Sequence, residues 1–336
     1  MKIIVEKNIP YIQGLLEPFG TVDYLPANEI TADTVKDADA LFVRTRTKCN
    51  AALLDGSRVK FIATATIGTD HIDLPYCREK GITVRNAPGC NAPAVAQYVF
   101  ATIARWMEGK PMSPRELTLG VVGVGNVGKI IVRWAHNLGF NVLECDPPRQ
   151  RAEGGNFVPL DEIARTADII TFHTPLNREG TDRTFHLADS KFLDNLDRCR
   201  LLINSSRGEV VDNAALLHAL ENGRLEAAAV DCWENEPDID RRLLEKVFVA
   251  TPHIAGYSAE GKTRATAMAL EAFEDFYGVT VAGKPVAEAP KLGANVSSLS
   301  QIAATYNPLD DTATLRRSPE TFEAQRNHYA LRAEVR

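Results

Sequence analysis

The chain has 336 residues, of which 45% are hydrophobic and 24% are charged, a composition typical of a globular protein with about two domains. Its formal net charge of −6 argues against nucleic acid or an anionic membrane as the main partner, because both favour a basic surface. We therefore expect the protein to act on a small molecule.

The cysteine pattern and the first residues both indicate a cytoplasmic protein. The 6 cysteines are scattered, with no C-x-x-C pair and no metal-ligand spacing, so we expect reduced thiols and no bound metal. The opening MKIIVEK carries a charge at Glu6 and no long apolar region, which predicts a strand and not a signal peptide. No run approaches the roughly 18 apolar residues of a membrane-spanning helix.

The first 91 residues alternate short apolar runs with helical patterns, which predicts a parallel sheet with helices outside it. The predicted strands are Ile3–Val5, Val22–Leu25, Ala40–Val43, Phe61–Thr64 and Ile82–Val84, and the predicted helices are Tyr11–Phe19 and Leu74–Lys80. A turn-rich stretch, Ala87–Pro93, then leads into a long predicted helix over Ala94–Met107.

A glycine-rich turn stands at the centre of the chain. The apolar run Leu117–Val122 predicts a buried strand, and Gly123, Gly125 and Gly128 follow it at G-x-G-x-x-G spacing. A helix should come next, because apolar residues recur at three- and four-residue steps until Gly139. A second strand, Asn141–Cys145, ends at an acid, Asp146.

This arrangement predicts a dinucleotide site. Glycines in such a turn allow close backbone approach, and the helix N-terminus that follows offers free N–H groups to a pyrophosphate. Asp146 lies about 20 residues beyond the glycines, where a carboxylate accepts from ribose hydroxyls and repels a 2′-phosphate, so NAD is favoured over NADP. Arg149 and Arg151 are the contrary signal, although we expect Pro147 and Pro148 to direct the chain away. The alternative is a glycine turn with a packing role only.

Beyond Asp146 the alternation resumes, which predicts a doubly wound sheet over residues 92–255. The predicted strands are Ile169–His173, Leu201–Asn204, Ala227–Asp231 and Val247–Ala250, with helices at Leu160–Thr166 and Ala214–Glu221. Helical spacing over Lys262–Tyr277 predicts a helix that packs back on the first domain, which would then comprise residues 1–91 and 256–283. Residues 284–336 form a C-terminal segment with a helix start at Ser318-Pro319-Glu320, and they serve either as a dimer contact or as a tail on their own subunit.

Three polar sequences each follow a predicted strand of the central sheet: SSRG from Ser205, CWENEP from Cys232 and TPHIAG from Thr251. Because the carboxyl ends of parallel strands meet at one edge, Arg207, Glu236 and His253 can converge there. Oxidation of a 2-hydroxy acid needs a base for the hydroxyl proton, for which His253 is the candidate. Glu236 can then hold the imidazole, and Arg207 can bind the substrate carboxylate. Taken singly, these residues also fit a solvated loop acid, a surface arginine and a capping histidine.

A second polar cluster, Arg44 to Lys48, follows a strand of the first domain, and Thr64 to Thr69 follows another. Hydroxyls, N–H groups and cations at strand ends make an anion site, although a solvated basic loop is the plainer alternative. With a cofactor nearby, the cluster suggests a substrate with a second anionic group besides its carboxylate.

The order of glycine turn, SSRG, ENEP and TPHIAG resembles the D-isomer-specific 2-hydroxyacid dehydrogenases over roughly residues 1 to 280. The resemblance implies a flavodoxin-like substrate domain, a Rossmann NAD domain, a homodimer, and Arg207, Glu236 and His253 as the catalytic set. It also implies NAD contacts, in addition to the three glycines, from Asn126, Val127, Asp146, Thr174, Ser205, Ser206, Asp231 and Gly256. It implies a small phosphorylated 2-hydroxy acid as the substrate, with substrate contacts from Thr45, Thr66 and Tyr257, next to Arg44. A non-catalytic NAD-sensing protein of the same fold, or a relative acting on 3-phosphoglycerate or glyoxylate, remains the alternative.

Overall fold

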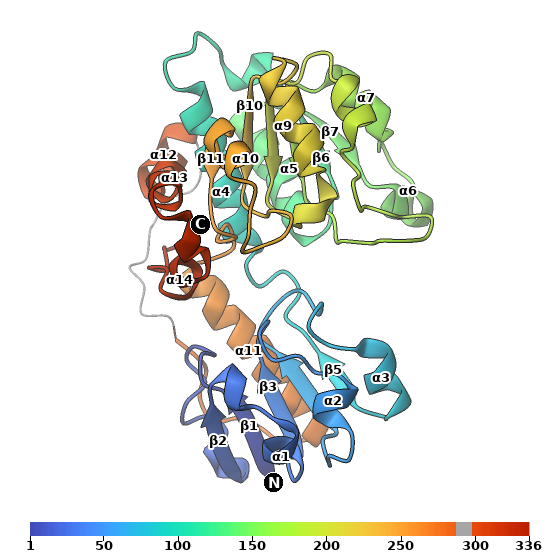
Figure 1. The fold of residues 1–336 in the computed structure, drawn as a ribbon, viewed down its shortest axis with the longest axis vertical. Helices are drawn as coiled ribbons and strands as arrows, with labels where there is room; N and C mark the ends of the chain where they lie inside the picture. Colours follow the sequence, from blue (N-terminus) through green and yellow to red (C-terminus); the bar gives the residue numbers. More distant parts are fainter. Residues whose placement is uncertain (287–297, 336) are drawn as a thin grey trace. The chain divides into compact units, whose positions relative to one another are not determined.

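The structure is a computed structural model that describes residues 1–286 and 298–335. The chain forms two compact units, each built on its own sheet. Residues 1–91 and 258–286 make the first unit, and residues 92–257 and 298–335 make the second. Both sheets contain only parallel pairs, so the predicted α/β class with two doubly wound sheets is confirmed (Figure 1).

The first unit holds a five-stranded sheet in the order β2-β1-β3-β4-β5. Its strands β3 and β4 are buried on both faces, as near-continuous apolar runs require in a parallel sheet. The strands are β1 (Lys2–Glu6), β2 (Thr21–Leu25), β3 (Ala40–Val43), β4 (Phe61–Thr64) and β5 (Thr83–Arg85). The helices are η1 (Glu17–Phe19), η2 (Ala27–Glu29), α1 (Ala32–Val35), α2 (Ala51–Leu54), α3 (Leu74–Glu79) and α11 (Ala259–Tyr277).

Helix α11 packs against the sheet of the first unit. Phe273 is fully buried, and its ring centroid lies 5.6 Å from that of Phe42 and 6.1 Å from that of Phe61. The helix predicted over Lys262–Tyr277 therefore exists and returns to the first sheet, as expected. It begins at a Ser258 N-cap and ends at Gly278, which adopts the left-handed conformation.

The helix predicted over Tyr11–Phe19 is wrong. Only Glu17–Phe19 forms a short 3₁₀ turn, and Tyr11 and Gly14 have φ angles of 62° and 84°, which no α-helix can contain. Ile12 and Leu16 are nevertheless buried, so the apolar spacing reflects a loop that packs on the core. Apolar periodicity reports which residues are buried, and here the tertiary contacts overrode the local signal.

The second unit holds a six-stranded sheet in the order β11-β10-β9-β8-β6-β7. One apolar cluster covers each face, and α4 and α5 contribute to one of them. The strands are β6 (Thr118–Val122), β7 (Asn141–Cys145), β8 (Ile169–Phe172), β9 (Leu201–Asn204), β10 (Ala227–Val230) and β11 (Val249–Ala250). The helices are α4 (Ala92–Met107), η3 (Pro114–Glu116), α5 (Asn126–Leu138), α6 (Pro147–Glu153), α7 (Leu160–Thr166), α8 (Ser190–Asp194), η4 (Gly208–Val210), α9 (Asn213–Glu221) and α10 (Arg241–Lys246).

The strand order fixes where a ligand binds in this unit. The chain runs from β6 outward to β7 and then returns to the other side of β6 to form β8. Ligands of open α/β sheets bind at such a switch point, outside the carboxyl ends of the strands. The glycine turn after β6 and the segment after β8 therefore border the expected crevice.

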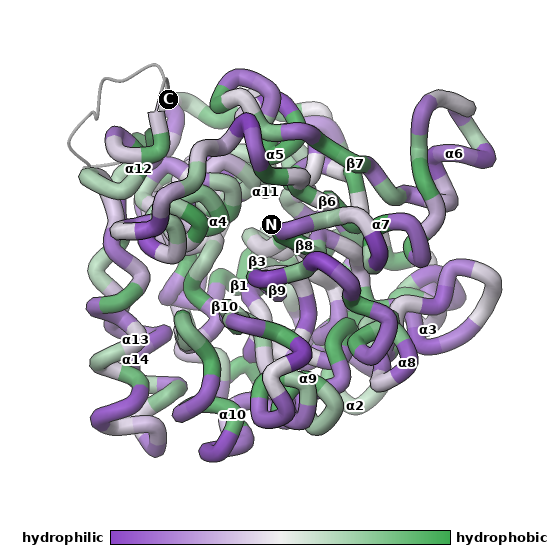
Figure 2. The backbone as a smooth tube through the Cα atoms, turned by 90° about the horizontal axis from the view of Figure 1, so that it is seen from above, coloured by the Kyte–Doolittle hydropathy of each residue, from purple (hydrophilic) through white to green (hydrophobic). Residues whose placement is uncertain are grey.

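The described C-terminal residues 298–335 pack on the second unit. They form α12 (Leu299–Thr305), α13 (Pro308–Arg317), η5 (Pro319–Thr321) and α14 (Phe322–Asn327). Phe322 and Leu315 join one apolar cluster of the sheet and Ile302 joins the other. Helix α12 lies along α4, which is hydrophobic over most of its length (Figure 2). Ser318 stands at the N-cap position of η5, where the helix start was predicted, although its side chain makes no capping hydrogen bond. The dimer contact of this segment stays a prediction.

The state of the cysteines and the character of the helices can be compared with the expectations from the sequence. All 6 cysteines are buried and free, so the expected absence of disulfides holds. Among the described residues no helix combines the length and the apolar character needed to cross a membrane.

Candidate active site

The glycine turn after β6 is shaped by close backbone approach. Gly123 has a φ of +87°, and a Cβ there would lie 2.7 Å from the backbone of His173, at the end of β8. A Cβ on Gly128 would lie 2.1 Å from the Gly123 carbonyl oxygen, so only glycine lets α5 start this close to β6. Gly125, in contrast, has no atom within 4 Å of its ideal Cβ position. The turn thus leaves open space at the N-terminus of α5, which begins at Asn126 and Val127.

Asp146 lies directly beside this turn. Its Oδ2 accepts a hydrogen bond of 2.8 Å from the backbone N–H of Val124, and its Oδ1 caps α6 by accepting from the N–H of Arg149 at 3.0 Å. We expected Pro147 and Pro148 to carry Arg149 away, and this is wrong. The two prolines start α6, which suits their fixed φ, and Arg149 donates to the carbonyl of Val124 at 2.9 Å. Glu153 pairs with Arg149 and offsets its charge.

Two buried hydroxyls at the same sheet edge have no hydrogen-bond partner among the described residues. They are Oγ1 of Thr174, after β8, and Oγ of Ser205, after β9. Unpaired buried polar atoms are costly, and a bound ligand is a usual explanation for them. Together with the open space at Gly125 and the free N–H groups of α5, these hydroxyls fit a dinucleotide. Ser206 differs, since its hydroxyl already donates to Oδ1 of Asn204 at 2.9 Å.

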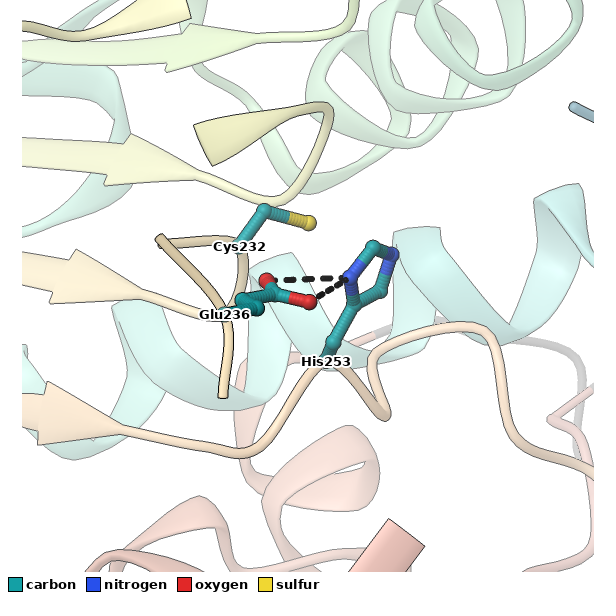
Figure 3. Close-up of side chains that lie close together, drawn as sticks. All are labelled: Cys232, Glu236 and His253. Atoms are coloured by element: carbon teal, nitrogen blue, oxygen red, sulfur yellow. Dashed lines mark hydrogen bonds and ion pairs between the residues drawn. The ribbon is translucent and has the colours of Figure 1, made fainter. Parts of the chain in front are cut away.

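Glu236 and His253 form the central pair of the site (Figure 3). The Nδ1 atom of His253 lies 2.9 Å and 3.1 Å from the two carboxylate oxygens of Glu236, and Glu236 also accepts from the N–H of Trp233 at 2.9 Å. Burial raises the pKa of Glu236, but His253, the Trp233 N–H and Arg326 outweigh it and lower the pKa below its usual value. An ionised Glu236 makes Nδ1 the donor, which leaves Nε2 of His253 as a proton acceptor.

The loop that carries His253 is fixed by Asp231. The carboxylate of Asp231 accepts from the Thr251 hydroxyl at 2.6 Å and from the N–H groups of Ile254 and Ala255 at 2.8 and 3.0 Å. His253 itself has a φ of +56°, an uncommon value for a residue with a side chain, and its N–H bonds to the Asp231 carbonyl at 2.8 Å. Asp231 was expected at the NAD site. Both of its carboxylate oxygens accept hydrogen bonds from the loop that carries His253, and Gly256 is the next residue of this loop.

Arg207 lies in the loop after β9, and this loop packs tightly on the loop that carries Glu236. A Cβ on the next residue, Gly208, would lie 1.9 Å from the carbonyl oxygen of Trp233. One guanidinium nitrogen of Arg207 donates to the Ser206 carbonyl at 2.8 Å. The three predicted residues therefore lie on neighbouring loops at the carboxyl edge of β9, β10 and β11.

Cys232 adds a thiol to the pair, and sequence reasoning missed it. The ligand-type atoms of Cys232, Glu236 and His253 lie within 4.8 Å of one another, a set that a metal can use. Burial and the charges of Asp231 and Glu236 raise the pKa of the thiol well above its usual value, and its Sγ lies 3.4 Å from the Ser206 carbonyl oxygen as a hydrogen-bond donor. A thiol held protonated in this way is a poor metal ligand.

Comparison with known proteins assigns the chain to a family. The model of the D-isomer specific 2-hydroxyacid dehydrogenase NAD-binding domain matches residues 96–255. An erythronate-4-phosphate dehydrogenase of Bacteroides thetaiotaomicron is 47% identical over 99% of this chain and 97% of its own length. This chain belongs to the D-isomer specific 2-hydroxyacid dehydrogenase family. The resemblance found in the sequence is confirmed, and the chain is an NAD-dependent oxidoreductase.

Further relatives of the dehydrogenase agree. An erythronate-4-phosphate dehydrogenase of Yersinia pestis is 43% identical over 99% of this chain and 93% of its own length. A D-lactate dehydrogenase from Aquifex aeolicus, solved with NAD and lactic acid, superposes with a TM-score of 0.69 at 25% identity, covering 83% of this chain and 96% of its own. A cofactor-bound 3-phosphoglycerate dehydrogenase from Entamoeba histolytica has a TM-score of 0.68 at 25% identity, covering 84% and 98%.

The first unit of the dehydrogenase has its own switch point, between β1 and β3, and the predicted anion cluster lies there. Glu6, which is buried at the end of β1, accepts from the backbone N–H of Arg44 and from the Thr47 hydroxyl, both at 2.8 Å. The Arg44 guanidinium donates to the Asn8 carbonyl at 3.0 Å. A buried acid thus shapes the loop that presents Thr45.

Thr66 lies at the end of the neighbouring strand of the same unit. Its hydroxyl lies 2.6 Å from that of Thr64, which in turn lies 3.1 Å from Nε2 of His71. Burial lowers the pKa of His71 to about 4, so this histidine is a neutral hydrogen-bond partner at physiological pH. Asp73 caps α3 by accepting from the N–H of Tyr76 at 3.0 Å.

The C-terminal segment contributes residues that sequence reasoning missed. Arg326, in α14, lies 3.8 Å from Oε2 of Glu236, and Arg332 donates to the carbonyls of Ala94, Ile254 and Ala255. Tyr329 meets Tyr257 edge to face, with ring centroids 6.1 Å apart. No spacing in the sequence connects these residues to the site, because the connection exists only in the folded chain.

Proposed function

We propose that this dehydrogenase oxidises 4-phospho-D-erythronate to 2-oxo-3-hydroxy-4-phosphobutanoate, a step of pyridoxine biosynthesis. The observation that carries the proposal is the His253–Glu236 pair on loops of a dinucleotide-binding sheet. The substrate assignment draws on the name shared by relatives that are 43% to 47% identical over nearly the whole chain.

The chain's own residues supply the proton chemistry. When bound, NAD accepts the hydride that leaves C2 of the substrate. Nε2 of His253 takes the proton of the C2 hydroxyl, so a carbonyl forms as the C–H and O–H bonds break. Glu236 stabilises the imidazolium that results, and Arg207 binds the substrate carboxylate and polarises the oxygen at C2.

The cofactor contacts follow the loops at the sheet edge. We assign the pyrophosphate to the turn of Gly123, Gly125 and Gly128 with the N–H groups of Asn126 and Val127, and the ribose to Asp146. The unpaired hydroxyls of Thr174 and Ser205 support contacts to the same cofactor. Ser206, Asp231 and Gly256 belong to the same loops, and through them the cofactor site adjoins His253.

The phosphate of the substrate is assigned to Arg44, Thr45 and Thr66, and Tyr257 is assigned a further substrate contact. A strand-end loop with a cation, hydroxyls and a free N–H is the chemistry that a phosphate requires. The buried Glu6 supports the assignment, because its carboxylate fixes the backbone of this loop through the N–H of Arg44 and the hydroxyl of Thr47.

The deciding experiment measures NADH formation from 4-phosphoerythronate, erythronate and 3-phosphoglycerate, with and without 2-oxoglutarate as an acceptor. Loss of a few charge-assisted hydrogen bonds, at about 1.5–3 kcal/mol each, should lower kcat/KM for erythronate by several orders of magnitude. Preference for 3-phosphoglycerate would be consistent with the proposed proton transfer through His253 but would reject the role in pyridoxine biosynthesis. If none of the three substrates yields NADH while NAD is shown to bind, an NAD-sensing protein is favoured.

The homodimer and the cytoplasmic location stay predictions from the family resemblance and the thiol content. Light scattering on the purified chain measures the oligomeric state directly. A monomer at micromolar concentration would reject the homodimer without affecting the chemistry.

A further inference from the structure

The C-terminal helix α14 brings a cation to the catalytic pair. The Arg326 guanidinium lies 3.8 Å from Oε2 of Glu236 and 2.9 Å from Oε1 of Glu323, one turn earlier in the same helix. The side chains of Arg326 and Glu236 are each only 18% exposed. At this burial two charges interact more strongly than a surface pair does, because less water screens them.

The same carboxylate oxygen of Glu236 serves both neighbours. Oε2 lies 2.9 Å from Nδ1 of His253 and 3.8 Å from Arg326. A shared oxygen couples the two cations, since any charge on Arg326 changes how strongly Glu236 favours a proton on His253. Glu236 is also fixed by the Trp233 N–H, so it cannot turn away from either neighbour without loss of that bond.

We propose that Arg326 is a positioning residue for the proton transfer: it holds the Glu236 carboxylate against His253 and offsets its charge, so that His253 returns readily to the neutral base. This inference rests on the proposed function of the pair. It gives the C-terminal segment a role in the chemistry of its own subunit.

Anchoring of the helix does not account for this contact. The segment is already held by Phe322 and Leu315 in the apolar core and by Arg316, which donates to the carbonyls of Leu244 and Val247. Arg332 fixes its end to the loop after β11. Arg326 reaches a side-chain carboxylate in the loop after β10, and its Nε is buried with no partner among the described residues.

The direction of the effect follows from the charges. With Arg326 present, part of the Glu236 charge is offset, and protonation of His253 gains less than it would beside an isolated carboxylate. The other titratable or charged groups that face the pair are Cys232 and Asp231 after β10, Arg207 after β9, Tyr257 after β11 and Glu323 in α14. None of these residues is substituted in an Arg326 variant, and Glu323, which loses its ion-pair partner there, shifts the pH profile in the same direction as the loss of the cation.

The test compares Arg326→Gln, Arg326→Lys and the matched control Arg316→Gln, which removes another arginine of the same segment. We expect Arg326→Gln to move the acidic limb of the kcat/KM profile up by about 1 pH unit and to lower kcat at neutral pH by about tenfold, with KM changed by less than about threefold. Arg326→Lys should return the acidic limb most of the way to its native pH, and Arg316→Gln should leave the pH profile unchanged.

Two outcomes overturn the proposal. An unchanged pH profile with KM raised tenfold or more would make Arg326 a substrate-binding residue. An unchanged profile with unchanged constants, or an equal effect of Arg316→Gln, would leave it with a structural role.

Two further measurements keep the test decisive. NMR titration of the His253 imidazole in the same variants needs no substrate, so it reports the positioning role even if the proposed reaction fails. If Arg326→Gln does not fold, Glu323→Gln takes its place. Loss of the competing carboxylate strengthens the influence of Arg326 on Glu236 and should move the acidic limb down, and a shift upward would contradict the proposal.

Discussion

Glu236 and His253 meet through Nδ1 of the imidazole, 2.9 Å from the nearer carboxylate oxygen, although they are 17 residues apart in the chain. Each comes from the loop after a different strand of one parallel sheet, β10 and β11. Glu236 thereby sets which ring nitrogen carries the proton, and Nε2 becomes the base.

Replacement of His253 with asparagine should remove the base and leave the cofactor site in place. We expect kcat to fall by about 10²- to 10⁴-fold, the usual loss for a positioned acid–base group. NAD binding, measured by fluorescence titration or calorimetry, should change little. A variant that turns over at nearly the native rate would exclude His253 from the mechanism.

Gly125 and Gly128 offer a matched pair of substitutions that separates binding from folding. Gly128→Ala places a Cβ 2.1 Å from the carbonyl oxygen of Gly123, so we expect unfolding free energy to fall by about 3 kcal/mol. Gly125→Ala meets no atom within 4 Å and should keep the native stability, yet its methyl group blocks the approach of the pyrophosphate and should weaken NAD binding at least about tenfold. Thermal melts and NAD titrations of both variants check the prediction, and equal NAD affinity in Gly125→Ala would reject this turn as the pyrophosphate site.

Asp146 caps α6, and its proposed second role is to accept from the ribose of NAD. Asp146→Asn keeps one acceptor oxygen for the cap and loses both the charge and the acceptor for the Val124 N–H, so the preference for NAD over NADP should relax by about tenfold or more and the free energy of unfolding should fall by about 1 kcal/mol. Asp146→Ala should show the same change and lose about 1 kcal/mol in addition. Steady-state kinetics with both cofactors, next to urea unfolding, distinguish the two roles.

His173 should make the protein less stable in acid. Burial lowers its pKa to about 3, and its Nε2 lies 2.8 Å from the hydroxyl of Thr171. Below the ordinary pKa of 6.5, His173 is protonated in the unfolded chain but stays neutral in the folded chain. The free energy of unfolding therefore decreases as the pH is lowered from about 6.5 to 3, by up to about 1.4 kcal/mol per pH unit. The variant His173→Phe should make this slope shallower by the contribution of His173 and leave the contribution of the buried His71, whereas the exposed His218→Gln should leave the slope unchanged. Melting temperatures from pH 7 to pH 4 measure the slope, and the same slope in His173→Phe would contradict the assignment.

Local rules were sufficient for most of the elements. The strand Asn141–Cys145 and the helix Leu160–Thr166 have the predicted bounds, because an apolar run or a three-to-four periodicity bounded by turn residues needs little tertiary context. The same rule failed at Tyr11–Phe19, where the apolar spacing belongs to a buried loop. It also gave no warning that Pro147 begins a helix, since the cap that starts α6 is the acid that we had assigned only to ribose.

By itself the sequence determined the residue types of the site and the sheet edge at which they meet. It did so because parallel strands all end at one edge, so SSRG, ENEP and TPHIAG had to share it. Only the tertiary structure decided which contacts those residues make: the bond between His253 and Glu236, the commitment of Asp231 to the His253 loop, and the approach of Arg326 from α14. These contacts join residues far apart in the chain across less than 4 Å, and packing of the core sets such distances, whereas sequence spacing carries no record of them.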